Sequence, residues 1–98
     1  MSANDPIITA TLQWRGRTIH ITYEPLKWDM LDHVEVISEG REPLPITETG
    51  YLSQFFGPVE PSLTAEEVVE VVRDHLDTAA TKRAWRNYEA DRQQLPLF

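Results

Sequence analysis

Apolar and polar residues alternate along the first quarter of the chain. Over residues 7–14 every second side chain is apolar, and residues 18–23 repeat the pattern. This period of two is typical of strands that are buried on one face. The Arg15-Gly16 pair between the two segments suits a tight turn. The pattern therefore predicts a β-hairpin. Its core-facing side chains are expected to be Ile8, Ala10, Leu12, Trp14, Ile19, Ile21 and Tyr23.

The pattern becomes less regular after the hairpin. Proline cannot donate to a strand ladder, so Pro25 is expected to end the second strand. Val34 and Val36 indicate a third strand over about residues 32–38. Residues 46–56 fit either a fourth, edge strand or an ordered loop. Three aromatic side chains in this stretch are expected to cover one end of the core: Tyr51, Phe55 and Phe56.

The clearest local signal in the body of the chain is a helix start. Thr64-Ala65-Glu66-Glu67 fits the capping box, in which the threonine and glutamate side chains satisfy N–H groups that the first turn leaves without partners. Apolar residues then recur at helical spacing, at Val68, Val69, Val72, Leu76 and Ala79. Trp85 and Tyr88 indicate a second helix that ends at about Arg92, although one long bent helix is an open alternative.

Together these elements predict a single α+β domain over residues 1–92. A three- or four-stranded antiparallel sheet comes first, one or two C-terminal helices pack on it, and residues 93–98 follow as an extended tail. A chain of 98 residues is long enough for one hydrophobic core and too short for two. The chain has no cysteine, which excludes disulfides, thiolate metal sites and cysteine nucleophiles.

Large apolar side chains gather in the last five residues, which are Gln94, Leu95, Pro96, Leu97 and Phe98. The proline favours an extended backbone that has little entropy left to lose on binding. The segment resembles the Gln-Leu-x-Leu-Phe peptide by which bacterial DNA polymerases, repair proteins and replication regulators dock on the sliding clamp. The resemblance implies that Gln94 forms a hydrogen bond at the rim of the clamp pocket, and that Leu97 and Phe98 fill the pocket. Pro96 departs from the small or acidic residue usual at that position. The alternative is that the tail folds back on its own domain as a packed arm.

The body also resembles a group of small proteobacterial proteins that are often encoded on mobile elements. They carry a Pro-Ile-Thr-Glu-Thr-Gly-Tyr segment like residues 45–51 ahead of a final helix, and the resemblance extends over much of residues 28–98. It implies a mobile-element origin and brings no assigned activity. The tail agrees with a bacterial, phage or plasmid origin, because the wider spacing and paired aromatics of the eukaryotic clamp peptide are absent.

The charge of the chain limits its partners. A net charge of −7 argues against direct binding to nucleic acid, since binding to the phosphate backbone depends on Lys and Arg. No apolar run approaches the roughly 18 residues of a membrane span, and the first residues lack the pattern of a signal peptide. We therefore expect a cytoplasmic protein that contacts neither nucleic acid nor membrane directly.

Four carboxylates recur at steps of four, four and three along the first predicted helix: Glu66, Glu70, Asp74 and Asp77. They share one helix face, here called the acidic face. Its negative potential can imitate DNA phosphates and occupy a basic groove on a nuclease or defence factor. The plainer interpretation is a solvent-exposed face with acids favoured near a helix N-terminus.

Two histidines and a carboxylate form a second polar set. His20 on the second strand, with His33 and Glu35 on the third, could share the open face of the sheet, and such a set can bind a metal ion. A plain polar sheet face is the preferred interpretation, because no further ligand or nucleophile stands beside them. The sequence also holds no phosphate loop, nucleophile elbow or paired-carboxylate motif. We therefore expect no catalytic residue, no metal-binding residue and no cofactor.

The sequence as a whole predicts a non-enzymatic interaction protein. It is expected to dock on the bacterial sliding clamp through residues 94–98, as an adaptor or modulator of replication or repair. An acidic inhibitor that imitates DNA is the alternative, and a small metal-dependent enzyme using His20, His33 and Glu35 is a weaker third. The oligomeric state stays open.

Overall fold

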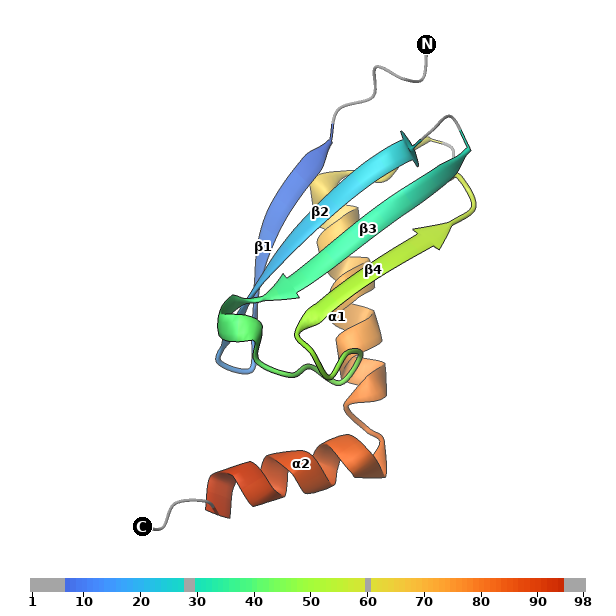
Figure 1. The fold of residues 1–98 in the computed structure, drawn as a ribbon. Helices are drawn as coiled ribbons and strands as arrows, with labels where there is room; N and C mark the ends of the chain where they lie inside the picture. Colours follow the sequence, from blue (N-terminus) through green and yellow to red (C-terminus); the bar gives the residue numbers. More distant parts are fainter. Residues whose placement is uncertain (1–6, 28–29, 60, 95–98) are drawn as a thin grey trace.

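A four-stranded sheet is followed by two α-helices (Figure 1). The computed structural model describes residues 7–27, 30–59 and 61–94. The elements are β1 (Ile8–Trp14), β2 (Arg17–Lys27), β3 (Leu31–Ser38), the 3-10 turn η2 (Glu39–Arg41), β4 (Tyr51–Phe56), α1 (Ala65–Ala79) and α2 (Arg83–Gln94). The strands lie in the order β1-β2-β3-β4, and each neighbouring pair is antiparallel. The predicted α+β fold is thus confirmed, with four strands and two helices.

The predicted hairpin is confirmed, with its turn at Arg15 and Gly16. Leu12 pairs with Ile19, and Trp14 pairs with Arg17 across the turn. Arg15 and Gly16 have positive φ angles of 49° and 80°, as in the type I′ turn that suits the twist of a hairpin. The expected inner face is correct, and its most deeply buried members are Leu12, Trp14, Ile19, Ile21 and Tyr23.

β2 continues past Pro25, so the predicted end of this strand is wrong. The ladder with β3 changes register between Glu24 and Lys27, and Leu26 adopts a positive φ of 51°. Pro25 therefore lies in a bulge, which is one of the few places where a strand accepts proline. The N–H of Leu26 donates to Oδ1 of Asp32 at 2.9 Å, so a side chain supplies the acceptor that the irregular ladder lacks.

Asp32 lies at the centre of a buried polar network. Its carboxylate accepts from the Tyr23 hydroxyl at 2.7 Å and from the N–H of Val59 at 3.2 Å, in addition to Leu26. The Tyr23 oxygen in turn accepts from the N–H of Leu63 at 3.2 Å. A buried carboxylate is tolerated only when its oxygens are well satisfied. The network therefore ties the segment that precedes α1 to the first strands of the sheet.

The fourth strand covers only part of residues 46–56, for which the sequence allowed either an edge strand or an ordered loop. β4 begins at Tyr51, and the residues before it form a loop that contains an isolated bridge between Leu44 and Thr47. Tyr51 and Phe55 point to the outer face of the sheet and are exposed, so the expectation that they cover the core is wrong. Phe56 does pack against the core. Alternation along the strand explains the difference, because neighbouring side chains face opposite sides.

The helix start agrees with the sequence. The N–H of Glu67 donates to Oγ1 of Thr64 at 3.1 Å, and the N–H of Thr64 donates to Oε1 of Glu67 at 2.9 Å, which completes the capping box. The buried residues of α1 are Val68, Val72 and Leu76, all members of the predicted apolar stripe. Within the described part of the chain, no helix is long and apolar enough to cross a membrane.

Two helices form instead of one long bent helix. α1 ends at Ala79, and the Thr81 hydroxyl donates to the carbonyl oxygen of Thr78 at 2.7 Å. A threonine side chain that bonds a nearby carbonyl competes with continued helical hydrogen bonding. α2 then lies below the sheet in Figure 1, at a steep angle to α1.

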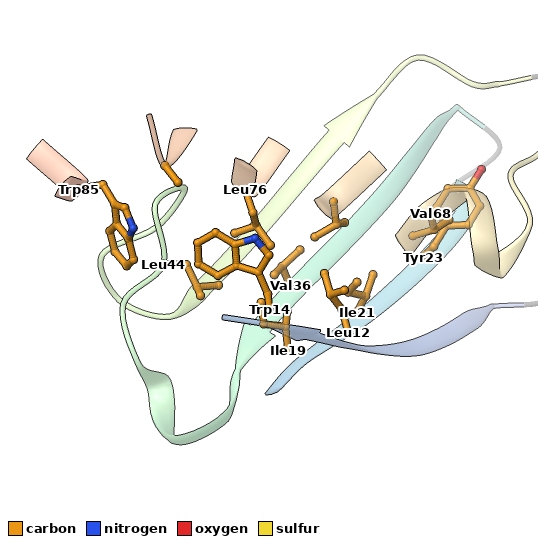
Figure 2. Packing of buried hydrophobic residues seen from close by; sticks show 12 residues of the cluster. Leu12, Trp14, Ile19, Ile21, Tyr23, Val36, Leu44, Val68, Leu76 and Trp85 are labelled. Atoms are coloured by element: carbon orange, nitrogen blue, oxygen red, sulfur yellow. The ribbon is translucent and has the colours of Figure 1, made fainter. Parts of the chain in front are cut away.

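The core lies between the inner face of the sheet and α1. Figure 2 shows Trp14, Leu76 and Leu44 at one end of this core, and Tyr23 with Val68 at the other. Among the strands, α1 contacts β1 most extensively. The helix is therefore offset towards the first strand of the sheet.

Candidate functional site

The helix that leads into the C-terminal peptide is anchored by aromatic packing. Trp85 in α2 is only 7% exposed, and its ring lies 6.3 Å from that of Trp14 and 5.0 Å from that of Tyr88, between ring centroids. Tilted rings at such distances add to the free energy gained from burial. The first two turns of α2 are thereby fixed to the end of the hairpin.

A partly buried ion pair reinforces this anchor. The side chain of Arg17 is 7% exposed, and its Nη2 donates to Oε2 of Glu89 at 3.1 Å. Its guanidinium also lies 5.1 Å from the ring centroid of Trp85 and 5.7 Å from that of Trp14. Charged hydrogen bonds shielded from water are stronger than exposed ones. Arg17 therefore joins the hairpin to the second turn of α2.

The remainder of α2 extends beyond these contacts. After Glu89, Ala90 and Asp91 are exposed, and the helix continues to Gln94. The predicted helix end at Arg92 is two residues too early, so residues 93 and 94 of the segment expected to be extended have a helical backbone. Figure 1 shows this end of α2 apart from the sheet. The four following tail residues, Leu95, Pro96, Leu97 and Phe98, lie outside the described residues, and their roles stay predictions.

The acidic face is present on α1, but half of its carboxylates have partners. Glu66, Glu70, Asp74 and Asp77 are all exposed. Asp77 Oδ1 accepts from the Trp14 indole N–H at 2.9 Å, and Glu70 forms an ion pair with Arg73. Glu66 and Asp74 make no hydrogen bond or ion pair with another described residue. The face is therefore partly a structural contact and only partly a free negative surface.

The histidine set is not brought together. His20 pairs with Ile37 and His33 pairs with Glu24, which places the two histidines four register positions apart, roughly 13 Å along the strands. His20 Nε2 lies 3.7 Å from Oε2 of Glu39, and His33 Nε2 lies 2.7 Å from Oγ of Ser53.

Glu35, the third member of that set, accepts instead from the Tyr51 hydroxyl at 3.0 Å. Over the part of the chain that the structure describes, no group of three potential ligands is placed to hold a metal ion.

The sequence did not predict an apolar groove of about 500 Å³ between α1 and the β3–β4 half of the sheet. Its floor includes Leu52 and Phe56 of β4, and its helix wall includes Val71, whose side chain is 49% exposed. The sequence feature that could have indicated this groove is Val71, because it is a large apolar residue outside the predicted stripe. Helical spacing alone does not tell whether such a residue meets solvent or a partner.

One comparison with known proteins identifies a family. The family described as the KlcB third domain matches residues 7–85, which include the sheet, α1 and the first residues of α2. No curated protein and no solved structure matches the chain. The match covers well over half of the 98 residues. The chain therefore belongs to the KlcB third domain family.

Proposed function

We propose that this protein is a non-enzymatic interaction protein of the bacterial cytoplasm that docks on the sliding clamp through residues 94–98. It acts there as an adaptor or as a modulator of replication or repair. The observation that carries the proposal is the Gln-Leu-x-Leu-Phe pattern of residues 94–98, which begins at the last residue of α2.

The size of the apolar side chains supports a moderate affinity. Burial of Leu95, Leu97 and Phe98 would contribute roughly 1.5–3 kcal/mol each before costs. Association and ordering then remove a large part of that sum. A micromolar complex, equivalent to about 8 kcal/mol, is a reasonable upper value for the peptide alone.

A pull-down with a bacterial sliding clamp tests the proposal. The intact chain should retain the clamp, and a chain that lacks residues 94–98 should not. The control is Val71→Asp, which changes an exposed residue of the groove and leaves the tail intact; it should retain the clamp like the parent. Retention by the truncated chain, or no retention by the parent, would remove the proposal.

The acidic face supports the alternative function, inhibition by DNA mimicry, less well. Of its four carboxylates, Asp77 is bonded to Trp14 and Glu70 is paired with Arg73. A mimic needs closely spaced charges that are available to the basic groove of its target. For this reason we place the function in the tail and not in the acidic face.

A further inference from the structure

The apolar groove lies beside a sheet edge that can accept another strand. Over the described residues, β4 pairs with β3 alone and is the last strand of the sheet. The N–H of Ser38 donates to the carbonyl oxygen of Gly50 at 2.8 Å, which fixes the phase of the ladder. Because hydrogen-bonded pairs alternate in antiparallel strands, the pair of Ser53 with Glu35 is a non-hydrogen-bonded one. The N–H and C=O of Ser53 therefore point to the outer edge.

One end of this edge is already covered by the protein itself. The carbonyl oxygen of Tyr51 points the same way as that of Ser53, and it accepts from the hydroxyls of Thr47 at 2.8 Å and Thr49 at 3.3 Å. These bonds confirm the phase of the ladder independently. They also limit the available edge to the second half of β4, which is the half beside Phe56 and the groove.

The groove offers apolar contact to side chains that an added strand would project inward. Leu52 and Phe56 form its floor, and Val71 stands on the opposite, helical wall. Side chains of a strand point alternately to the two faces of a sheet. Every second side chain of a strand added to β4 would therefore point towards α1, over the mouth of the groove.

The negative charge beside the groove favours an added strand that carries basic residues. On the surface of α1, the helical neighbours of Val71 at positions i−4 and i+3 are Glu67 and Asp74, both exposed. Asp74 has no ion pair with another described residue, and the whole chain carries a net charge of −7. Lys or Arg at inward-facing positions next to the apolar ones would meet an opposite potential along this wall.

We propose that the groove binds an extended, basic segment of a partner protein, which adds to the outer edge of β4 as a fifth strand. The backbone of the segment bonds with Ser53, and its alternate apolar side chains pack against Leu52, Phe56 and Val71. This combination of main-chain hydrogen bonds and side-chain pockets is the general mode of strand addition. The residues that line the groove all precede α2, so this proposal does not depend on the proposed clamp docking through residues 94–98.

A second copy of the chain is a poorer occupant of the groove. Pairing of two β4 edges would bring two acidic α1 surfaces near each other, and each copy carries a charge of −7. Like charges across an interface oppose association. The charge therefore favours a basic partner over self-association.

A phage-displayed library of random peptides, selected against the full chain, provides the probe. The enriched peptides should carry apolar residues together with Lys or Arg at every second position, and calorimetry on one synthetic peptide gives the affinity. Ser53→Pro removes the N–H at the edge and should weaken that peptide about tenfold or more. Ser53→Ala loses only the hydroxyl contact with His33, keeps the N–H, and should bind like the parent. Thermal melts of both variants check that they fold like the parent.

A second pair of variants tests the groove itself. Val71→Asp places a charge on the apolar wall and should weaken the peptide about tenfold or more. Ala90→Asp adds the same charge at an exposed position of α2 and should have no effect. The proposal is overturned if no peptide is enriched or if Ser53→Pro binds normally. It is equally overturned if light scattering shows a dimer of the parent that Ser53→Pro abolishes. Leu97→Ala with Phe98→Ala should bind the peptide normally, so failure of clamp docking would leave this result intact.

Discussion

The two halves of the inner face of the sheet are covered to different extents. On the β1–β2 half, Leu12, Ile19 and Ile21 are at most 2% exposed. On the β3–β4 half, Leu52 and Phe56 are only half-buried although they are equally apolar. The protein thus buries the centre of the β1–β2 half, together with Val36 of β3, and leaves the inner face of β4 more accessible. Contiguous apolar surface that stays accessible in this way is the starting point of the strand-addition proposal.

The position of the helices explains the difference. α1 is offset towards β1, and α2 is attached to the end of the hairpin through Trp85 and Glu89. Neither helix covers β4 as closely. The buried contacts of the β1–β2 half and the buried network around Asp32 should therefore carry most of the stability. Exposed residues beside the groove and on the surface should tolerate change, and three pairs of substitutions can test this comparison.

The largest expected effect is that of Trp14→Ala in the fully covered half. It removes a buried indole that contacts Trp85 and donates to Asp77. Loss of a buried tryptophan costs about 3–5 kcal/mol of unfolding free energy. The matched change in the open half, Val71→Ala, should cost less than about 0.5 kcal/mol, because its side chain is half exposed.

Chemical denaturation of both variants measures this comparison. A loss below about 1 kcal/mol for Trp14→Ala would contradict the assignment of stability to the β1–β2 half. Equal losses for both variants would show that α1 and the sheet are packed evenly along their length.

Asp32→Asn should have an intermediate effect at the other end of the core. The amide group would replace one of the two oxygens that accept from Tyr23, Leu26 and Val59. A buried donor left without a partner costs about 1–3 kcal/mol, or roughly 4–8 °C in the melting temperature for each kcal/mol in a domain of this size.

The control for Asp32→Asn is Glu35→Gln, which alters a partly exposed carboxylate on the outer face of the sheet. Its melting temperature should stay close to that of the parent. If the two variants melt alike, the buried network does not stabilise the segment that precedes α1.

The smallest expected difference in stability is that between substitutions of two carboxylates of the acidic face. Asp77→Ala removes the acceptor of the Trp14 indole N–H and should cost about 0.5–1.5 kcal/mol. Asp74→Ala removes no described partner and should be neutral or slightly stabilising, because alanine favours the helix. Denaturation curves of equal midpoint for the two variants would show that the contact of Asp77 with Trp14 contributes nothing.

Local patterns predicted the elements of this fold well. Alternation over residues 7–14 and 18–23 gave the hairpin, and the capping box at Thr64 gave the start of α1. These signals depend on residues close together in the sequence. The continuation of β2 past Pro25 depends instead on Asp32, whose carboxylate holds the bulge from the next strand. The alternation of apolar and polar residues within β2 therefore could not predict that the strand continues past Pro25.

Sites that join residues distant in the sequence were likewise not predicted. Arg17 and Glu89 are 72 residues apart, and the groove joins residues of three strands, α1 and the segments before it. Such surfaces appear only when the offset of α1 is known. Likewise, strand register alone decided that His20 and His33 lie apart. The tail differs, because a linear peptide motif can be recognised without the fold; its role stays a prediction.

Calorimetric titration against a bacterial sliding clamp tests the central claim, which is that the tail and not the core of this protein engages the clamp. The parent should bind with micromolar affinity. Leu97→Ala with Phe98→Ala removes roughly 3–6 kcal/mol of apolar burial and should abolish detectable binding, while the melting temperature stays unchanged. Equal binding by the double variant, or no binding by the parent, would contradict the claim, and a large fall in melting temperature would show that the tail is a structural arm.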